Sequence, residues 1–283
     1  MSIDLEEHNE EVIAAAEEGK AYLLKQLLET PCEPHAVYTA IEMAAGNGHV
    51  ECVALLIPLC THSGKHFPLE NSLRWAAWAG RLECVKLLSS VADPQYNDSF
   101  ALRQAARQGQ RDCVQYLIPL SNPKADNSAA LHAAAEGGNI ECVELLLPHT
   151  DPTSSSSRAL FRAADWGHAE IVKRLIPLSN PKADDSRALW MAAVNGHLDC
   201  VRLLVPHSDV KIRGSRALAA AATKQHWELF NFLAPHSDMD QARAHMQPCD
   251  VKHWDEAVHH YQRLIFSQEV GDIEHTSVRS RKM

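Results

Sequence analysis

The fold of this chain is decided by residues 157–177, which read SRALFRAADWGHAEIVKRLIP. Nearly the same stretch stands 29 residues earlier, at 128–148, as SAALHAAAEGGNIECVELLLP, and 29 residues later, at 186–206, as SRALWMAAVNGHLDCVRLLVP. A fixed period of this length indicates a solenoid, in which each repeat packs only on its neighbours. We therefore expect an extended surface that binds rather than catalyses.

Eight copies of the repeat fill residues 11–238, and all are spaced by 29 residues except for one interval of 32, where residues 61–70 hold an insertion. The copies begin near Glu11, Ala40, Ser72, Ala101, Ala130, Ala159, Ala188 and Ala217. The first seven copies predict two helices joined at a glycine, which is the expected C-terminal stop of the first helix, and in the eighth copy Gln225 replaces the glycine. Proline is expected to end the second helix in six copies, at Pro58, Pro119, Pro148, Pro177, Pro206 and Pro235.

A serine opens the best copies, at Ser99, Ser128, Ser157, Ser186 and Ser215. Serine is a good N-cap because its hydroxyl accepts a hydrogen bond from a free backbone N–H in the first turn. We therefore expect these serines to cap the first helix of each copy. Segments such as Ser179 to Ala183 (SNPKA) are expected to turn the chain back toward the next serine.

The unit resembles the ankyrin repeat. The resemblance is carried by the pattern Ala-Leu-x-x-Ala-Ala-x-x-Gly-His at residues 159–168 and 188–197, followed by Ile-Val or Cys-Val and a leucine. It implies an all-α fold, an α-solenoid of stacked helix-turn-helix ankyrin-like repeats. The family's usual unit has about 33 residues and opens with Thr-Pro-Leu-His. In this chain the unit is shorter and opens with Ser-x-Ala-Leu, so we expect stunted fingers between the repeats.

The two ends of the chain differ from the repeats. Residues 1–10 form an acidic N-terminal segment. Within the expected capping region, residues 239–266, one helical face would carry Trp254, Val258, Tyr261 and Ile265 at spacings i, i+4, i+7 and i+11. We expect this helix to cover the last repeat and the polar residues 267–283 to be disordered.

Composition argues against several classes of partner. The formal net charge of −9 disfavours a nucleic-acid backbone or an anionic membrane surface as the main partner. No run of 18 apolar residues is present, and the acidic N-terminus is unlike a signal peptide. Five of the eight cysteines share one repeat position, where the sixth full copy has Ile171, so they are expected to be small buried apolar residues in a reducing cytoplasm. They are Cys52, Cys84, Cys113, Cys142 and Cys200.

A binding face is expected where residues vary while the framework stays fixed, just before each glycine and just after each serine. In the ankyrin family the matching positions line a concave groove, so the resemblance implies contact with a partner protein there. The candidate partner-binding residues are Trp78, Phe100, Arg107, Gln108, Glu136, Arg158, Asp165, Trp166, Arg187 and Asn195. Aromatic and arginine side chains are typical of interface hot spots.

Each of these assignments has a structural alternative. Solvated residues in a first helical turn are an equally good interpretation of Arg158, Arg187 and Arg216. For Trp78 and Trp166 the alternative is that neighbouring turns cover the two rings. Trp75 and Trp190 fit packing between repeats better than contact with a ligand.

The many histidines do not predict a metal site. His49, His168, His197 and His226 occupy the Gly-His framework position, where the family's imidazole is structural. Two local groups have zinc-type ligands: Cys60, His62 and His66 in the insertion, and His245, Cys249 and His253 near the C-terminus. Each lacks a fourth ligand, and proline interrupts the second. We expect no metal and no cofactor.

No catalytic motif is present, since the chain lacks Gly-x-Ser-x-Gly, a P-loop, Gly-x-Gly-x-x-Gly and His-Glu-x-x-His. We expect a non-enzymatic, cytoplasmic and monomeric scaffold that binds a partner protein in its groove. One alternative is an array that positions a metal or catalytic site in residues 239–283 or 61–70. Another is a translocated bacterial effector, a use that some ankyrin-type proteins have and with which a polar C-terminus is compatible.

Overall fold

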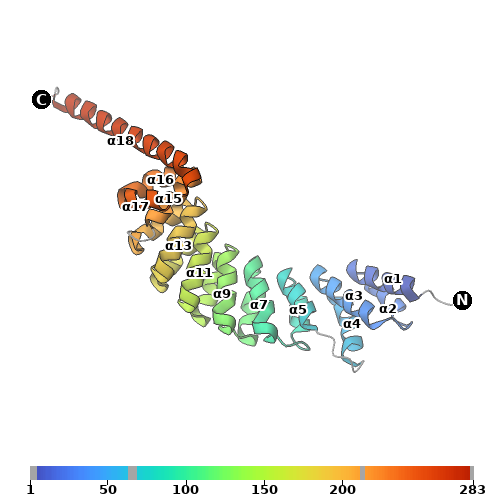
Figure 1. Ribbon diagram of the computed structural model, residues 1–283. Helices are drawn as coiled ribbons and strands as arrows, with labels where there is room; N and C mark the ends of the chain where they lie inside the picture. Colours follow the sequence, from blue (N-terminus) through green and yellow to red (C-terminus); the bar gives the residue numbers. More distant parts are fainter. Residues whose placement is uncertain (1–4, 63–68, 211–213, 281–283) are drawn as a thin grey trace. The chain divides into compact units, whose positions relative to one another are not determined.

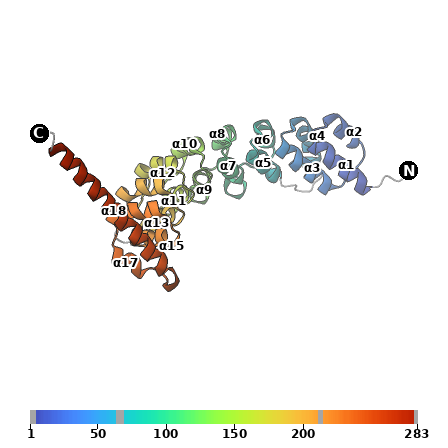
Figure 2. The ribbon, with the colours of Figure 1, turned by 90° about the horizontal axis from the view of Figure 1, so that it is seen from above.

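The computed structural model describes residues 5–62, 69–210 and 214–280, and it divides into two compact units, residues 1–154 and 155–283. In each unit, helices stack in two layers, one formed by the first helix of every repeat and the other by the second (Figures 1 and 2). The described residues contain helices and turns but no strand, which confirms the expected all-α class.

The first unit contains five helix pairs. Its first helices are α1 (Leu5–Glu17), α3 (Pro34–Asn47), α5 (Leu69–Trp78), α7 (Tyr96–Gln108) and α9 (Ala125–Glu136). Its second helices are α2 (Ala21–Leu27), α4 (Val50–His62), α6 (Leu82–Leu88), α8 (Arg111–Leu117) and α10 (Ile140–Leu146). Each helix contacts its counterpart in the next repeat, and Figure 2 shows the two rows from above.

The second unit contains three helix pairs and a C-terminal cap. Its first helices are α11 (Ser154–Asp165, entered from the last residue of the first unit), α13 (Ala183–Val194) and α15 (Ser215–Thr223). Its second helices are α12 (Ala169–Leu175), α14 (Leu198–Leu204) and α16 (Trp227–Leu233). The chain then forms α17 (Met239–Ala244), a short 3-10 turn (Pro248–Asp250) and α18 (Val251–Ser280).

The core repeats with the sequence. The copies that begin at Ala101, Ala130, Ala159 and Ala188 all bury the Ala-Leu and Ala-Ala pairs of the first helix and the Cys-Val or Ile-Val pair of the second. Alanine lets neighbouring first helices approach closely, and leucine fills the space between the layers. The repeat cysteines are buried and free, and burial raises the pKa of the Cys113, Cys142 and Cys200 thiols to about 11. They therefore behave as small apolar residues, as expected.

The glycine that ends each first helix is required for two reasons. Gly167 has a φ of +79°, a left-handed conformation that a residue with a Cβ adopts at a cost. A Cβ there would also lie 2.5 Å from Nδ1 of His197 in the next repeat. In the last copy Gln225 takes this position with a φ of 60°, and α17 follows in place of another repeat. At Gln225 the left-handed backbone still favours glycine, but there is no side chain of a next repeat for a Cβ to meet.

The serine that opens each copy does not cap its own helix, which corrects the N-cap expectation. The backbone N–H of Asn122 donates to Ser99 Oγ at 2.8 Å, and the N–H of Asn180 donates to Ser157 Oγ at 2.8 Å. Ser128 and Ser186 accept in the same way from Asp151 and Asp209. Each of these four buried serines thus binds the turn that starts the next copy, 23 residues later in the chain. The hydroxyl is unavailable to its own helix because the serine itself has a left-handed backbone.

A short left-handed turn stands where strands of a longer finger would lie. In α11, Ser155, Ser156 and Ser157 have φ values of 47°, 57° and 61°. The equivalent positions in three other copies hold Asn-Asp, Asp-Asn or Asp-Asp before the serine. Asn and Asp tolerate this conformation better than most residues. Just before the turn, the Asn180 side chain accepts from the N–H of Lys182 at 3.1 Å, and this local bond closes the Asn-Pro-Lys bend.

Proline ends the second helix in five copies but not in the second. Pro119, Pro148, Pro177, Pro206 and Pro235 each lie in a 3-10 turn that follows the α-helix. Pro58, in contrast, lies inside α4, which corrects the expectation at that position. In this copy the sequence after the proline continues into the insertion at residues 61–70 in place of the short inter-repeat turn of the other copies.

The ends of the chain also extend beyond the expected helices. Helix α1 begins at Leu5, inside the segment expected to precede the repeats. Helix α18 packs on the last repeat through Trp254, which is buried with its ring edge-on to Phe230 at 5.6 Å, whereas Ile265, expected on the same face, is exposed. The backbone of α18 continues to Ser280, into the segment 267–283 that was expected to be disordered, and residues 281–283 lie outside the described residues.

Candidate partner-binding surface

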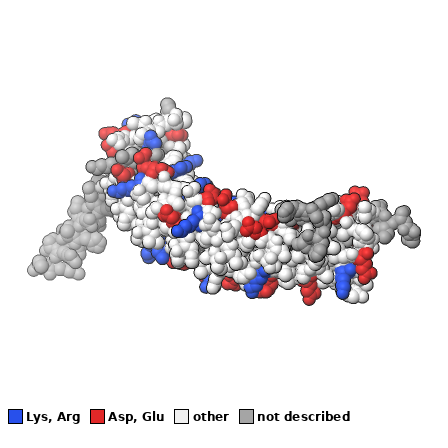
Figure 3. All heavy atoms as spheres, turned by 90° about the horizontal axis from the view of Figure 1, so that it is seen from below, with Lys and Arg blue, Asp and Glu red and all other residues white. Residues whose placement is uncertain are grey.

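The predicted site residues lie on the first helices or directly after them: Phe100, Arg158 and Arg187 lie in the first half of their helices, and the others lie at the C-terminal ends. Trp78 in the first unit is 42% exposed, and Trp166 in the second is 56% exposed. The alternative in which neighbouring turns bury these two rings is therefore wrong. On the face shown in Figure 3, acidic and basic side chains are interspersed and uncharged side chains cover most of the surface.

Trp78 belongs to a small apolar patch on the first unit. Its ring lies edge-on to Trp75, with centroids 5.6 Å apart, and Trp75 is itself 37% exposed. Met43, on the neighbouring helix α3, is also exposed. Gly46 lies next to the Trp75 side chain, since a Cβ built on Gly46 would be in van der Waals contact with Cβ of Trp75, at 3.9 Å. Exposed tryptophan and methionine on adjacent helices are suited to contact with apolar side chains.

Phe100 is held between two arginines rather than left open. The Arg103 guanidinium lies 4.9 Å from the ring centroid and that of Arg74 lies 5.5 Å away, with Arg74 also over Trp75. Arg103 further pairs with Asp126 at 3.3 Å and donates to the carbonyl of Asn97 at 3.3 Å. These contacts tie Phe100 to the turn between repeats, so its ring is only partly available to a partner.

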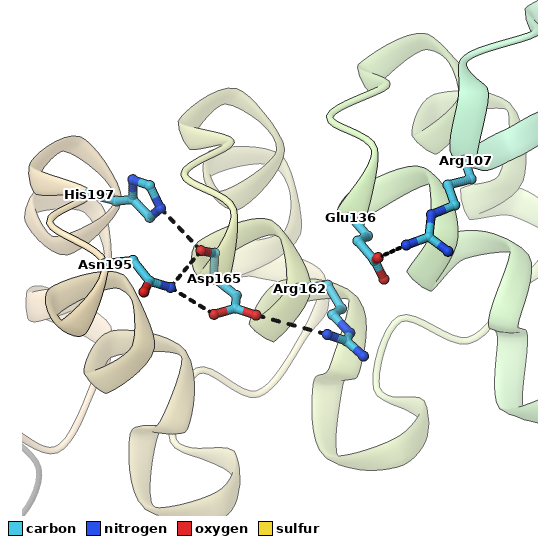
Figure 4. A network of polar contacts seen from close by, with 6 residues as sticks. All are labelled: Arg107, Glu136, Arg162, Asp165, Asn195 and His197. Carbon is cyan, nitrogen blue, oxygen red and sulfur yellow. Dashed lines mark hydrogen bonds and ion pairs between the residues drawn. The ribbon is translucent and has the colours of Figure 1, made fainter.

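Arg107 and Glu136 form an ion pair between two consecutive first helices of the first unit (Figure 4). The Glu136 carboxylate is mostly shielded, whereas half of the Arg107 side chain is exposed. A half-exposed pair of this kind contributes little to stability, about 0.2–1 kcal/mol. The next residue on the helix, Gln108, is exposed.

Asp165 is the centre of a network between repeats in the second unit (Figure 4). The Asn195 amide donates to both the backbone carbonyl and the carboxylate of Asp165, each at 2.9 Å. A ring nitrogen of His197 lies 3.1 Å from the same carbonyl, and Arg162 approaches the carboxylate at 3.9 Å. Asp165 and Asn195 thus join two repeats, while Trp166 projects beside them.

Two of the four framework histidines, His49 and His197, have the structural role that was expected. His49 Nε2 lies 2.9 Å from the carbonyl of Glu17, as His197 lies against that of Asp165. Other donors replace histidine in other copies: Gln110 reaches the carbonyl of Trp78 at 3.1 Å and Asn139 that of Arg107 at 2.8 Å. Carbonyls at a helix C-terminus lack a partner within the helix, so each repeat satisfies those of the preceding one.

A cavity of about 550 Å³ opens on the second unit between α11 and α13. Arg158 and Arg187 line it at equivalent positions of consecutive repeats, together with Phe161. The Arg187 guanidinium lies 4.5 Å from the centroid of the Phe161 ring, which fixes its orientation. A second cavity, of about 400 Å³, is lined by Trp190, Arg216 and Lys224.

Three parts of this surface were not expected from the sequence. Met43 was missed because it stands in a copy whose variable positions look unremarkable, Gly46 and Asn47. Arg74 and Arg103 were missed because they follow the leucine, a position assigned to packing. Their recurrence one repeat apart was the available signal.

No group of three His, Cys, Asp or Glu side chains that could hold a metal ion is found within residues 5–62, 69–210 and 214–280. The C-terminal candidates His245, Cys249 and His253 are among the residues searched, whereas His66 of the insertion lies outside them. In the same described part of the chain, no helix has the length and apolar character needed to cross a membrane.

Comparison with known families gives one match. A family model described as ankyrin repeats in three copies matches residues 12–98, 102–187 and 160–243. No curated protein matches the chain.

Proposed function

The chain belongs to the ankyrin repeat family, and on that premise we propose that it is a non-enzymatic scaffold that holds a partner protein on the exposed face of its first helices. Ankyrin repeats generally mediate protein–protein interaction. The partner would lie against the residues that vary from copy to copy, whereas the Ala-Leu and Ala-Ala framework carries the fold.

The observation that carries this proposal is the exposure of Trp166. More than half of its surface is open to solvent, although it stands beside a network that orders its own helix end. Tryptophan is one of the side chains most enriched among interface hot spots, which cluster near the centre of an interface. The exposed Trp78 supports the same interpretation for the first unit.

The proposed mechanism is rigid presentation. Bonds such as those from Asn195 and His197 to Asp165 fix neighbouring repeats before any partner arrives. Little conformational entropy is then lost on association, which favours affinity. Asp165 and Asn195 would act partly through this order, so their substitution would disturb both folding and binding.

A capture experiment with paired tryptophan variants tests the proposal. Wild type, Trp78→Ala/Trp166→Ala and the control Lys173→Ala, which changes an exposed residue on the second helix α12, are used to capture proteins from lysate of the source cells. The proposal expects a partner that the control retains and the double variant loses, with unchanged melting temperatures. Equal capture by all three proteins would refute it.

The remaining features of the proposal concern state and location. We propose a monomer in the cytoplasm, where the free cysteines would stay reduced. Metal analysis of the purified protein addresses the competing metal-site function. The scaffold proposal expects no stoichiometric zinc and the same stability in chelator, and bound zinc lost together with stability would contradict it.

A further inference from the structure

The three repeats of the second unit all have arginine at the same repeat position, and helix stability does not explain this choice. Arg158, Arg187 and Arg216 each follow the opening serine of their copy, at the start of the right-handed part of α11, α13 and α15. The N-terminal end of a helix carries partial positive charge, so a cation there is unfavourable. The equivalent residues of the two preceding copies are the uncharged Phe100 and Ala129.

These three arginines keep their charge available at the surface. All three are exposed, and none forms an ion pair with a residue of the described ranges. The Arg187 guanidinium instead lies over the Phe161 ring, 4.5 Å from its centroid, and a guanidinium in such a cation–π contact still has N–H donors that suit a carboxylate. The competing acid in the cavity is Asp184, while Asp165 is already bound by Asn195.

The arginines also open onto space. Arg158 and Arg187 line the cavity of about 550 Å³, and Arg216 lines the cavity of about 400 Å³ with Lys224. Each cavity has an aromatic wall, Phe161 in the first and Trp190 in the second. The last copy has Ala219 and Ala220 where the preceding one has Trp190 and Met191, which makes room for the second cavity.

The three residues Arg158, Arg187 and Arg216, called the arginine row below, come from consecutive repeats, and the distance between repeats indicates the conformation of a ligand that would contact all three. Neighbouring packed helices lie about 8–10 Å apart. A polyproline II segment rises about 3.1 Å per residue with three residues per turn, so every third side chain points the same way at intervals of about 9 Å. A β-strand does not match this pattern. Its side chains alternate between two faces, so residues i and i+3 point to opposite faces.

We propose that Arg158, Arg187 and Arg216 bind an extended segment of the partner protein that carries an acidic side chain at every third residue. The inference rests on the proposed scaffold function and adds the chemistry of the partner. The aromatic walls would contact the residues between the acids, as aromatic grooves do with proline-rich segments.

Fluorescence anisotropy with labelled peptides tests the inference on the full chain. The probe is Asp-Pro-Pro repeated three times, and the controls are Asn-Pro-Pro repeated three times and a peptide of the same composition with the three Asp residues adjacent. We expect the spaced acidic peptide to bind at least about fivefold more tightly than either control, and less tightly as salt is added. Equal affinity for all three peptides would overturn the inference.

Matched variants assign the binding to the row. Arg187→Gln and Arg158→Gln should each lower the affinity for the spaced acidic peptide about fivefold and leave the melting temperature unchanged. Arg202→Gln, an equal change of charge on the second helix α14, should leave that affinity unchanged. If Arg202→Gln lowers the affinity as much as Arg187→Gln does, the peptide is held by general charge attraction, and the proposed binding site on the arginine row is refuted. A single-stranded oligonucleotide that competes more strongly than the spaced peptide would also overturn the assignment.

The two proposals fail separately. If the tryptophan pair is needed for capture but the row variants bind the spaced peptide like wild type, the acidic-segment inference is wrong and the scaffold function stands. If capture is insensitive to the tryptophans, the scaffold assignment itself fails.

Discussion

Removing the hydroxyl of Ser157 should loosen the junction between two repeats. Ser157 is 2% exposed, and its Oγ accepts the backbone N–H of Asn180 at 2.8 Å. Ser157→Ala leaves that N–H without a partner in a part-buried turn, which costs about 1–3 kcal/mol. The backbone strain at φ 61° stays the same, because alanine and serine both carry a Cβ. The loss therefore reports the hydrogen bond.

Hydrogen exchange is the most direct assay, because a repeat array can open locally. The Asn180 amide should exchange about 5- to 150-fold faster in Ser157→Ala, since each 1.4 kcal/mol is a factor of ten. The matched control is Ser156→Ala, at an exposed neighbour that is also left-handed, with an expected change within about 0.5 kcal/mol. Equal exchange in the two variants would refute the role of the serine.

Three further predictions concern the core and the cap. Gln225→Gly should stabilise the last repeat by about 1 kcal/mol, measured by thermal unfolding, because the left-handed φ of 60° no longer strains a side-chain-bearing residue. Trp254→Ala should cost about 3–5 kcal/mol and reduce exchange protection in α16, since the ring packs on Phe230. The melting temperature should fall as the pH rises from about 9 to about 11, because burial raises the pKa of the Cys142 thiol and its repeat equivalents from 9.0 to about 11.

Each of these predictions has a result that contradicts it. A lower melting temperature for Gln225→Gly would mean that the glutamine side chain makes a stabilising contact. Unchanged protection of α16 in Trp254→Ala would show that α18 is not a cap. In the pH series the unfolded chain releases thiol protons first, so the thiol contribution to stability is full below about pH 9 and is lost above it. Cys142→Ala should weaken this pH dependence, and an unaltered slope would contradict thiol ionisation as its cause.

The helices and their core could be predicted because each repeat restates them. Ala-Leu, Ala-Ala and Cys-Val define faces with helical spacing, and those faces are buried. The left-handed turn was missed, although Asp-Asn and Asp-Asp before a serine are suited to it. The serine bonds could not be predicted, because a donor 23 residues away reaches the hydroxyl only after the next repeat has packed.

The candidate site was predictable as a face but not as a set of contacts. Trp166 was found because it departs from a fixed framework, and it is exposed. Asp165 and Asn195 were found by the same rule, yet they bond to one another across two repeats. Their pairing depends on the register between helices, which a repeat pattern does not specify.

Site-specific photo-crosslinking tests the central claim most directly. A photoreactive phenylalanine analogue is placed at Trp166, on the exposed end of a first helix, or at Lys173, on the exposed side of the second helix α12. We predict that irradiation in the source cells joins the Trp166 position to a partner protein and leaves the Lys173 position uncoupled. Crosslinks from Lys173 and none from Trp166 would contradict the account, because the partner would then bind the layer of second helices.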